Sequence, residues 1–452
     1  MLSRLFDLIA SPIALACIPL VLFVLSTAKR SPRVAWLLFT LCCFAASLAK
    51  FRDQFILEPP ALVFPLQQLR EIGRPLSIML LGLLLVLGMQ TKKGWRRQLM
   101  PPALHYLIVV QGVIFFKTLA YGSIGFAFLA ALTFGAVILM LKLAPCSWLQ
   151  DEASFQLAVW SVAMVGVIFV IANGYQGAVN IYAITFIHGR LLGTTGNPQH
   201  AAVLLSSTVP CLMFLFENHQ RFDWHKGIWL ASLVFVAIAL FMTGSRTGAL
   251  MTVVTIVLFY RTKGVALVRF GLLAAIALVI IVPLLGQDGI LFGADVTSVG
   301  DRFSSSDNTR AHVWSAMWRG FSNNPFFGAP LRGDRLGYGE NSWLAAGATL
   351  GLMGFIPMVM FGIECLKMIV KLMGLSKRQP AYFLHCSTVI AGLASLLVGS
   401  FFEAFLLGNL SFSLLVTLIY LCLGQYLLEV EQRERDYYLP QNFLNSTFSR
   451  TV

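Results

Sequence analysis

Residues 286–341 read GQDGILFGADVTSVGDRFSSSDNTRAHVWSAMWRGFSNNPFFGAPLRGDRLGYGEN and separate two long apolar segments. Six carboxylates and five arginines fall within this stretch, in a chain whose other long stretches are nearly uncharged. The segments on either side are long and apolar enough to cross a bilayer, and this one is not. We therefore divide the chain into an N-terminal transmembrane bundle at 1–285, a large loop at 286–341, and C-terminal transmembrane helices with a tail at 342–452.

The middle of this loop predicts an amphipathic helix. Residues 306–309 are of the types that cap helix N-termini, and Asn323-Asn324-Pro325 would end the helix. An apolar stripe lies between them at helical spacing, formed by Val313, Trp314, Met317, Trp318 and Phe321. Arg310 and the first backbone N–H groups of such a helix make a candidate anion site. We expect the loop to form the lid and wall of an active site, with the Trp314 and Trp318 face packed on the bundle or inserted in lipid.

Composition excludes a soluble enzyme. The 452 residues are 58% hydrophobic and 12% charged, with a mean hydropathy of +0.78. The chain is predicted to be an all-α, polytopic membrane protein of about twelve helices, because a helix of about 20 apolar residues spans a bilayer. The predicted spans are 12–28, 32–49, 75–90, 102–116, 122–142, 155–173, 200–217, 227–241, 247–260, 265–285, 342–372, 381–402 and 409–428. The first apolar run has no convincing signal-peptide cleavage site and is kept as a helix.

The net charge of +13 comes largely from clusters in short connections, which is typical of cytoplasmic loops. No basic, aromatic-bearing soluble surface for a nucleic acid is present. The basic connections after 260 and after 372, and the charged tail after 429, are predicted to share the cytoplasmic side. The connections at 50–74, 174–199, 242–247 and 286–341 then face the other side, which is the periplasm for an inner-membrane protein of a Gram-negative cell. The eight cysteines form no C-x-x-C pair and predict neither a disulfide framework nor a zinc site.

Arginines on the predicted outer face run against this topology. Arg190 stands in H-G-R-L-L-G-T-T-G-N-P-Q (188–199), Arg246 in T-G-S-R-T-G (243–248), and Arg310 at the start of the loop helix; Arg70 and Arg74 flank the start of the third span. Each one alone could be a snorkelling anchor at a helix end. Several arginines beside glycine-rich backbone favour a bound polyanion, because guanidinium groups match phosphate bidentately.

These motifs together resemble the O-antigen ligase and polymerase superfamily. The resemblance rests on G-R-L-L-G-T-T-G-N-P-Q, on T-G-S-R-T-G, and on the loop pattern N-T-R-A-H-V-W, N-N-P-F-F-G and E-N-S-W-L-A-A-G-A-T-L-G-L-M-G, and it covers about 186–355. It implies a metal-independent, inverting glycosyltransferase without a cofactor. Such an enzyme takes a glycan from undecaprenyl diphosphate at the periplasmic face and transfers it to lipid A–core oligosaccharide or to another lipid-linked repeat unit.

The resemblance also implies roles for individual residues. Arg246 and Arg310 match the two arginines that the ligases require, and Arg190 matches the arginine before the Gly-Asn-Pro segment. We assign Asn197 and Asn341, which lie in the same motifs, to substrate binding with the three arginines. The chemistry agrees, since arginines can stabilise the departing diphosphate without a metal. No P-loop or Asp-x-Asp metal pair occurs on the outer face, as expected for a donor that is already activated.

The position that commonly holds histidine in this family is Glu340 here. A base must take the proton of the acceptor hydroxyl, and Glu340 is our candidate. Alternatively, Glu340 caps the next helix or pairs with Arg332 or Arg335. His188 and His312 are weaker candidates for the base, because a lone histidine is more often structural.

O-antigen ligase is the leading functional hypothesis, and an O-antigen polymerase is the alternative within the same fold. A lipid or solute transporter belongs to a different class and predicts mid-membrane ionisable residues and internal repeats. The sequence shows few such charges and no clear repeat, since Glu364 and Glu403 lie near span ends. A purely structural membrane subunit would leave the arginines unexplained. The expected partners are the lipid-linked glycan, lipid A–core and membrane lipids, with no nucleic acid.

Overall fold

The computed structural model describes residues 62–70, 100–121, 124–139, 151–185, 189–219, 223–265, 310–330, 340–408 and 410–448, with scattered positions elsewhere and side chains as far as 433. Long helices dominate this part of the chain, as predicted. They are α5 (Pro102–Ala120), α6 (Ile124–Ile138), α8 (Glu152–Val179), α10 (Pro198–Asn218), α11 (Trp224–Met242), α12 (Arg246–Phe259), α17 (Leu352–Arg378), α18 (Phe383–Ser400) and α19 (Phe412–Phe448). Shorter elements are α9 (Tyr182–Thr185), η2 (Gly193–Thr195), α15 (Ala311–Asn323), α16 (Ser342–Leu350), η3 (Pro380–Tyr382), and the strands β1 (Ile290–Leu291) and β2 (Ala294–Asp295).

Seven of the described helices are long and apolar enough to cross a membrane, and α6 and α12 are shorter apolar helices. The predicted spans at 102–116, 155–173, 200–217, 227–241, 381–402 and 409–428 each coincide with one of the seven. Those at 12–28, 32–49, 75–90 and 265–285 lie outside the continuously described ranges, so the total of about twelve stays a prediction. β1 and β2 form a two-stranded antiparallel hairpin, which is a small addition to the predicted all-α class.

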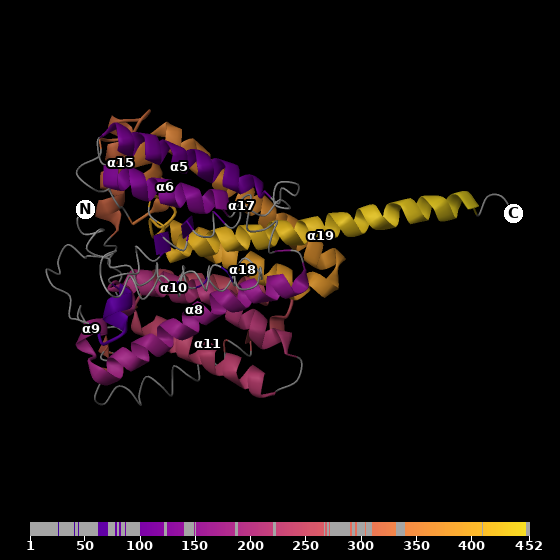
Figure 1. Cartoon of the computed structure of the whole chain (residues 1–452), viewed down its shortest axis with the longest axis horizontal. Coiled ribbons are helices and arrows are strands. Elements are labelled where there is room, and N and C mark those ends of the chain that lie inside the picture. The colour runs from indigo at the N-terminus through magenta and orange to yellow at the C-terminus, as the bar shows by residue number, and fades with distance from the viewer. Residues whose placement is uncertain are drawn as a thin grey trace.

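The helices form one elongated bundle (Figure 1). Helix α10 lies at its centre and packs against α8, α11, α12 and α18. Small residues allow these close approaches: a Cβ added to Gly248 of α12 would lie 2.7 Å from the Cβ of Ala202 on α10. Packing through small residues is a general way for membrane helices to associate. Helices α5, α6 and α17 form a second group beside α18 and α19.

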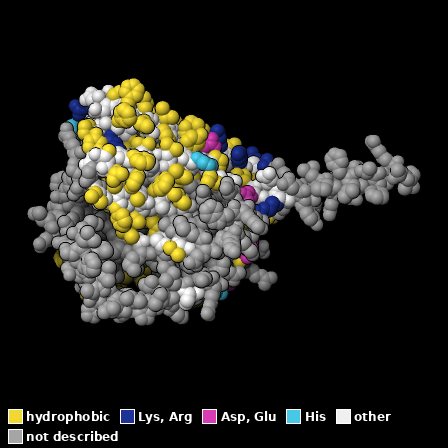
Figure 2. Space-filling model, turned by 45° about the horizontal axis from the view of Figure 1, so that its top comes forward, with side chains coloured by type: hydrophobic (Ala, Val, Ile, Leu, Met, Phe, Trp, Pro, Cys, Tyr) yellow, Lys and Arg dark blue, Asp and Glu magenta, His cyan; other side chains and the backbone are white. Residues whose placement is uncertain are grey.

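The outer surface of α5 and α6 is strongly apolar. Large hydrophobic side chains such as Val109, Phe116, Ile124 and Phe128 are exposed there. The face in Figure 2 shows hydrophobic side chains gathered over its middle, with charged ones toward its two ends. A surface with this distribution suits contact with lipid along its middle and with water at both ends.

Basic residues gather at one end of the bundle. Arg261, after α12, donates hydrogen bonds to Ser376 at 2.8 Å and to Ser387 at 2.9 Å. Arg378 pairs with Glu431 of α19 at 2.7 Å. The connections after 260 and after 372 and the charged tail therefore share one end, as predicted. Helix α19 runs out past this end, whereas α15 lies at the opposite end (Figure 1).

The single span predicted at 342–372 is wrong, because the chain forms two helices that meet at Gly351. Gly351 has φ 65° and ψ −155°, which ends α16 and starts α17 in a new direction. The chain at Pro325–Ala329 packs into this break: Leu352 donates to the carbonyl of Pro325 at 2.7 Å, and Ala329 to that of Ala348 at 2.8 Å. Gly328, with φ 72°, lies against the backbone of α16, and Gly351 lies against the backbone of Phe326 and Gly328. Neither glycine leaves room for a Cβ.

Lys117 of α5 fastens the same region. Its ammonium group donates to the carbonyl oxygens of Phe327, Ala329 and Thr349. Two of the motifs therefore pack against each other, namely N-N-P-F-F-G (323–328) and G-A-T-L-G (347–351). This contact fixes α16 relative to the loop helix α15.

Candidate functional site

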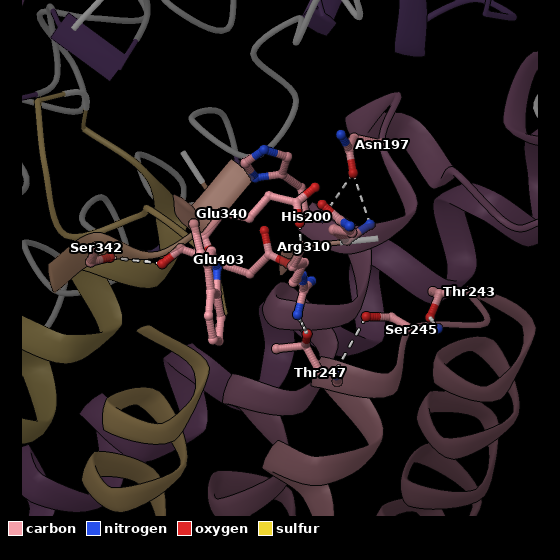
Figure 3. A network of polar contacts seen from close by, with 12 residues as sticks. Asn197, His200, Thr243, Ser245, Thr247, Arg310, Glu340, Ser342 and Glu403 are labelled. Carbon is pink, nitrogen blue, oxygen red and sulfur yellow. Dashed lines mark hydrogen bonds and ion pairs between the residues drawn. The ribbon is translucent and has the colours of Figure 1, made fainter. Parts of the chain in front are cut away.

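Arg310 stands at the centre of a polar cluster at the α15 end of the bundle (Figure 3). It is the N-cap residue of α15, and its own side chain makes no capping hydrogen bond to this helix; the cap predicted within 306–309 lies outside the described residues. The guanidinium reaches three side chains from three other elements. Its Nε donates to Glu340 at 2.9 Å, one terminal nitrogen to Thr247 at 2.9 Å, and the other to Glu403 at 2.7 Å.

Glu340 lies directly before α16 and is 34% exposed, whereas the side chain of Arg310 is only 17% exposed. Its backbone carbonyl accepts a 3.4 Å hydrogen bond from the indole of Trp314 on α15. The structure therefore pairs Glu340 with an arginine, but that arginine is Arg310. Arg332 and Arg335, the expected alternatives, lie outside the described residues. Asn341, and not Glu340, caps α16.

Glu403 was not among the predicted site residues. It lies in the connection after α18, and its backbone carbonyl accepts a 2.7 Å hydrogen bond from the Ser342 hydroxyl at the start of α16. Burial raises the pKa of Glu403 to about 8; the charges of Arg310 and Arg190 oppose this shift, and that of Glu340 adds to it. The buried carboxyl group therefore holds its proton more strongly than an exposed carboxyl group does. Its only sequence signal is an acidic residue at the end of an apolar span.

Thr247 was also missed, although it stands in T-G-S-R-T-G beside Arg246. It is buried in the first turn of α12, and its hydroxyl accepts from Arg310. Ser245 caps this helix through a hydrogen bond from the Gly248 amide at 3.3 Å. Arg246 is the first residue of α12 and is exposed. The T-G-S-R-T-G segment between α11 and α12 thus presents a charged side chain outward, at Arg246, and a hydroxyl inward, at Thr247.

Arg190 is buried, and the chain around it binds the backbone of the same segment at the end of α11. Its Nε donates to the carbonyl of Thr243 at 2.7 Å, and the Leu191 amide donates to that of Met242 at 3.0 Å. Gly244 has φ 58°, and a Cβ there would come within 3.2 Å of the Arg190 Nε. Arg190 therefore fixes the loop at 189–192 against the start of α12, close enough to Glu403 for its charge to lower that pKa.

Asn197 and Asn341 both act as helix caps. The Asn197 side chain accepts from the amides of Gln199 and His200 at the start of α10, and the Asn341 side chain accepts from those of Trp343 and Leu344. Figure 3 shows Asn197 and His200 beside the Arg310 cluster. These contacts give both asparagines a structural role, and their assignment to substrate remains a prediction.

The apolar stripe of α15 divides in the folded chain. Met317 is buried, Trp314 packs on the core and lies 6.1 Å from the ring of Phe402, and Trp318 is exposed. Of the two histidines weighed as bases, His312 is exposed on α15 and His188 lies outside the described residues. Arg70 is buried, and Arg74 lies outside the described residues.

Within the part of the chain that the structure describes, no three histidine, cysteine or acidic residues form a group that could hold a metal ion. Glu340 and Glu403 converge, but the guanidinium of Arg310 joins them. Chemically, the cluster offers a cation for an anionic group and a partly exposed carboxylate beside it.

The apolar helical bundle with an arginine–carboxylate cluster at one end defines a multi-pass membrane protein with a polar site. Residues 231–359 match the family model described as O-Antigen ligase. This match confirms the resemblance to the O-antigen ligase and polymerase superfamily over that part of the chain. It includes Arg246, Thr247, Arg310 and Glu340, whereas Arg190 and Glu403 lie outside it. No protein of curated function matches the chain significantly.

Proposed function

We propose that this protein is an O-antigen ligase, which transfers a glycan from undecaprenyl diphosphate to lipid A–core oligosaccharide at the periplasmic face of the inner membrane. The observation that carries this proposal is the cluster of Arg310 with Glu340, which lies within the region that matches the family. A diphosphate donor requires a cation and the acceptor hydroxyl requires a base, and this cluster brings one of each into contact.

In the proposed reaction, the acceptor hydroxyl attacks the anomeric carbon of the donor sugar. The new carbon–oxygen bond forms as the bond between that carbon and the phosphate oxygen breaks, with inversion, and the electron pair leaves with undecaprenyl diphosphate. Arg310 and Arg246 stabilise the negative charge that develops on the leaving diphosphate. Glu340 takes the proton of the acceptor hydroxyl.

Donor binding requires an exchange of partners at Arg310. Glu340 holds the guanidinium at 2.9 Å, so a phosphate group that binds Arg310 competes with this ion pair. An arginine matches both carboxylate and phosphate through the same fork of N–H groups. The exchange would leave Glu340 unpaired, which is the state in which it can accept a proton. In this scheme the base becomes available when the donor is bound.

Purified protein mixed with lipid-linked glycan tests the proposal, with and without lipid A–core and with neither metal nor nucleotide added. Glycan attached to lipid A–core is the expected product. Lengthened lipid-linked glycan, formed without the acceptor, would instead identify an O-antigen polymerase. The absence of any transfer, with donor movement across a vesicle membrane, would favour the transporter alternative.

A further inference from the structure

The three partners of the Arg310 guanidinium differ in how deeply they are buried. Thr247 is 3% exposed, the side chain of Glu403 is 12% exposed, and that of Glu340 is 34% exposed. A ligand that enters from outside therefore meets Glu340 first. The two terminal nitrogens of the guanidinium face the buried partners, and Nε faces the exposed one.

Both buried partners are themselves held in place. Thr247 belongs to the first turn of α12, which Ser245 caps and which packs tightly on α10 through Gly248 and Ala202. The connection that carries Glu403 is tied to α16 through the Ser342 hydroxyl, which donates to the Glu403 carbonyl and accepts from the Leu406 amide at 3.4 Å. The ring of Phe402 lies 5.5 Å from the centre of the guanidinium.

We propose that Thr247 and Glu403 are positioning residues, which keep the Arg310 guanidinium in one orientation while it exchanges Glu340 for the diphosphate of the donor. This proposal rests on the glycosyltransferase function proposed above. Two hydrogen bonds, one to each terminal nitrogen, fix the plane of a guanidinium group, and a single bond leaves it free to turn.

The chemistry of the two positioning groups suits this task. A threonine hydroxyl is neutral, and burial raises the pKa of Glu403, which disfavours its charged form. Glu340 is then the main charge that the diphosphate must displace. A fixed cation needs no reorganisation when charge develops on the leaving group, and small misplacements of such groups reduce rates severely.

Thr247→Val removes the hydroxyl at almost constant volume, and Thr247→Ser keeps it. Thr255→Val is the matched control, because Thr255 is buried on the same helix and its hydroxyl has no hydrogen-bond partner among the residues that the structure describes. For transfer from lipid-linked glycan, we expect Thr247→Val to lower kcat by about tenfold or more, since hydrogen bonds to charged groups are among the stronger ones. The donor KM should change less than kcat, Thr247→Ser should retain most of the rate, and Thr255→Val should match wild type.

Glu403 provides the second comparison. Glu403→Gln preserves an acceptor for Arg310 and should stay active near neutral pH, whereas Glu403→Leu should lose kcat as Thr247→Val does. Wild-type kcat in Thr247→Val would overturn the positioning role, as would a serine variant as slow and as thermally unstable as the valine variant. Failure of the proposed function would look different: the wild-type protein would not transfer glycan, or Arg310→Ala would transfer it at the normal rate.

Discussion

Arg310 and Glu403 lie 93 residues apart in the chain, and their side chains meet at 2.7 Å. This contact joins the N-terminus of the loop helix α15 to the connection between two membrane helices, α18 and α19. Because Arg310 also binds Thr247 at the start of α12, the loop helix is fastened to both sides of the bundle at one point. The position of the loop and the charge state of the site are therefore coupled through a single guanidinium group.

Arg310→Ala is expected to abolish transfer, with a loss of about 10²–10³-fold or more, because an electrostatic donor in the site disappears. Arg310→Lys should rescue poorly, since an ammonium group cannot bind Thr247, Glu403 and a phosphate through one planar fork. The measurement is the initial transfer rate from lipid-linked glycan at saturating acceptor.

Arg246→Ala should also abolish transfer while membrane insertion and thermal stability stay near normal, as expected for an exposed residue. Wild-type rates in Arg246→Ala would remove this arginine from the diphosphate site.

Gly351→Ala is expected to destabilise the fold strongly. Its φ of 65° with ψ −155° lies in a region that is essentially restricted to glycine, and occupying it costs about 1–3 kcal/mol for other residues. The added methyl group would also meet the backbone of Phe326. Thermal unfolding in detergent measures the loss. Gly112→Ala, on α5, is the control, because a Cβ there meets no atom within 4 Å and alanine favours a helix. Equal melting temperatures for the two variants would contradict the close packing of Gly351 against the backbone of Phe326.

Most of the described fold follows from the sequence, because a bilayer demands long apolar runs and the chain supplies them. The run at 200–217 predicted α10 to within two residues at each end. The apolar run at 342–372 predicted one helix where the chain forms two, because hydropathy reflects apolar side chains and carries no information on the backbone conformation of Gly351. The position of the loop helix was predicted from its apolar stripe, but the exposure of Trp318 depends on how α15 packs, which periodicity alone does not determine.

The site was predictable only in part. Motifs pointed to Arg310 and Glu340 separately, and the sequence alone did not join them. Their contact, and those with Thr247 and Glu403, depend on how four distant segments pack. Glu403 looked like an ordinary acidic residue at a span end because its burial is a property of the folded bundle. Asn197 and Asn341 stand in the predicted motifs, and the capping roles that the structure gives them also follow from asparagine before an apolar helix.

Glu403→Gln is expected to change the pH dependence of stability. Burial raises the pKa of Glu403 in the folded protein from 4.5 to about 8, so between these values the folded state holds a proton that the unfolded state has released. Stability contributed by this group therefore falls as pH rises from about 5 to 8 and levels off above that. Glutamine cannot titrate, so the variant should show a smaller decline in melting temperature over this range. Parallel profiles for the two proteins would show that Glu403 titrates normally.

Transfer is expected to survive EDTA and to need no nucleoside triphosphate, because arginines carry the stabilisation of charge on the diphosphate. The measurement is product formation by purified protein after exhaustive chelation, with and without added magnesium and ATP. A rate that falls on chelation and returns with a divalent ion would contradict a mechanism based on arginines alone.

Substitutions of Glu340 distinguish a catalytic role for this residue from a structural one. As the base, Glu340→Gln should lose about 10²–10⁴-fold in rate, because the amide cannot take a proton from the acceptor hydroxyl. Its oxygen can still accept the 2.9 Å hydrogen bond from Arg310, so the cluster should remain folded and thermal stability should change little. Glu340→His should retain much of the rate, since an imidazole can also act as a base at this position. If Glu340 serves only to hold Arg310, the order reverses: glutamine is tolerated better than histidine, and the main loss is in stability. Transfer rates and melting temperatures of the two variants therefore distinguish the roles, and a fully active, stable Glu340→Gln protein would exclude Glu340 as the base.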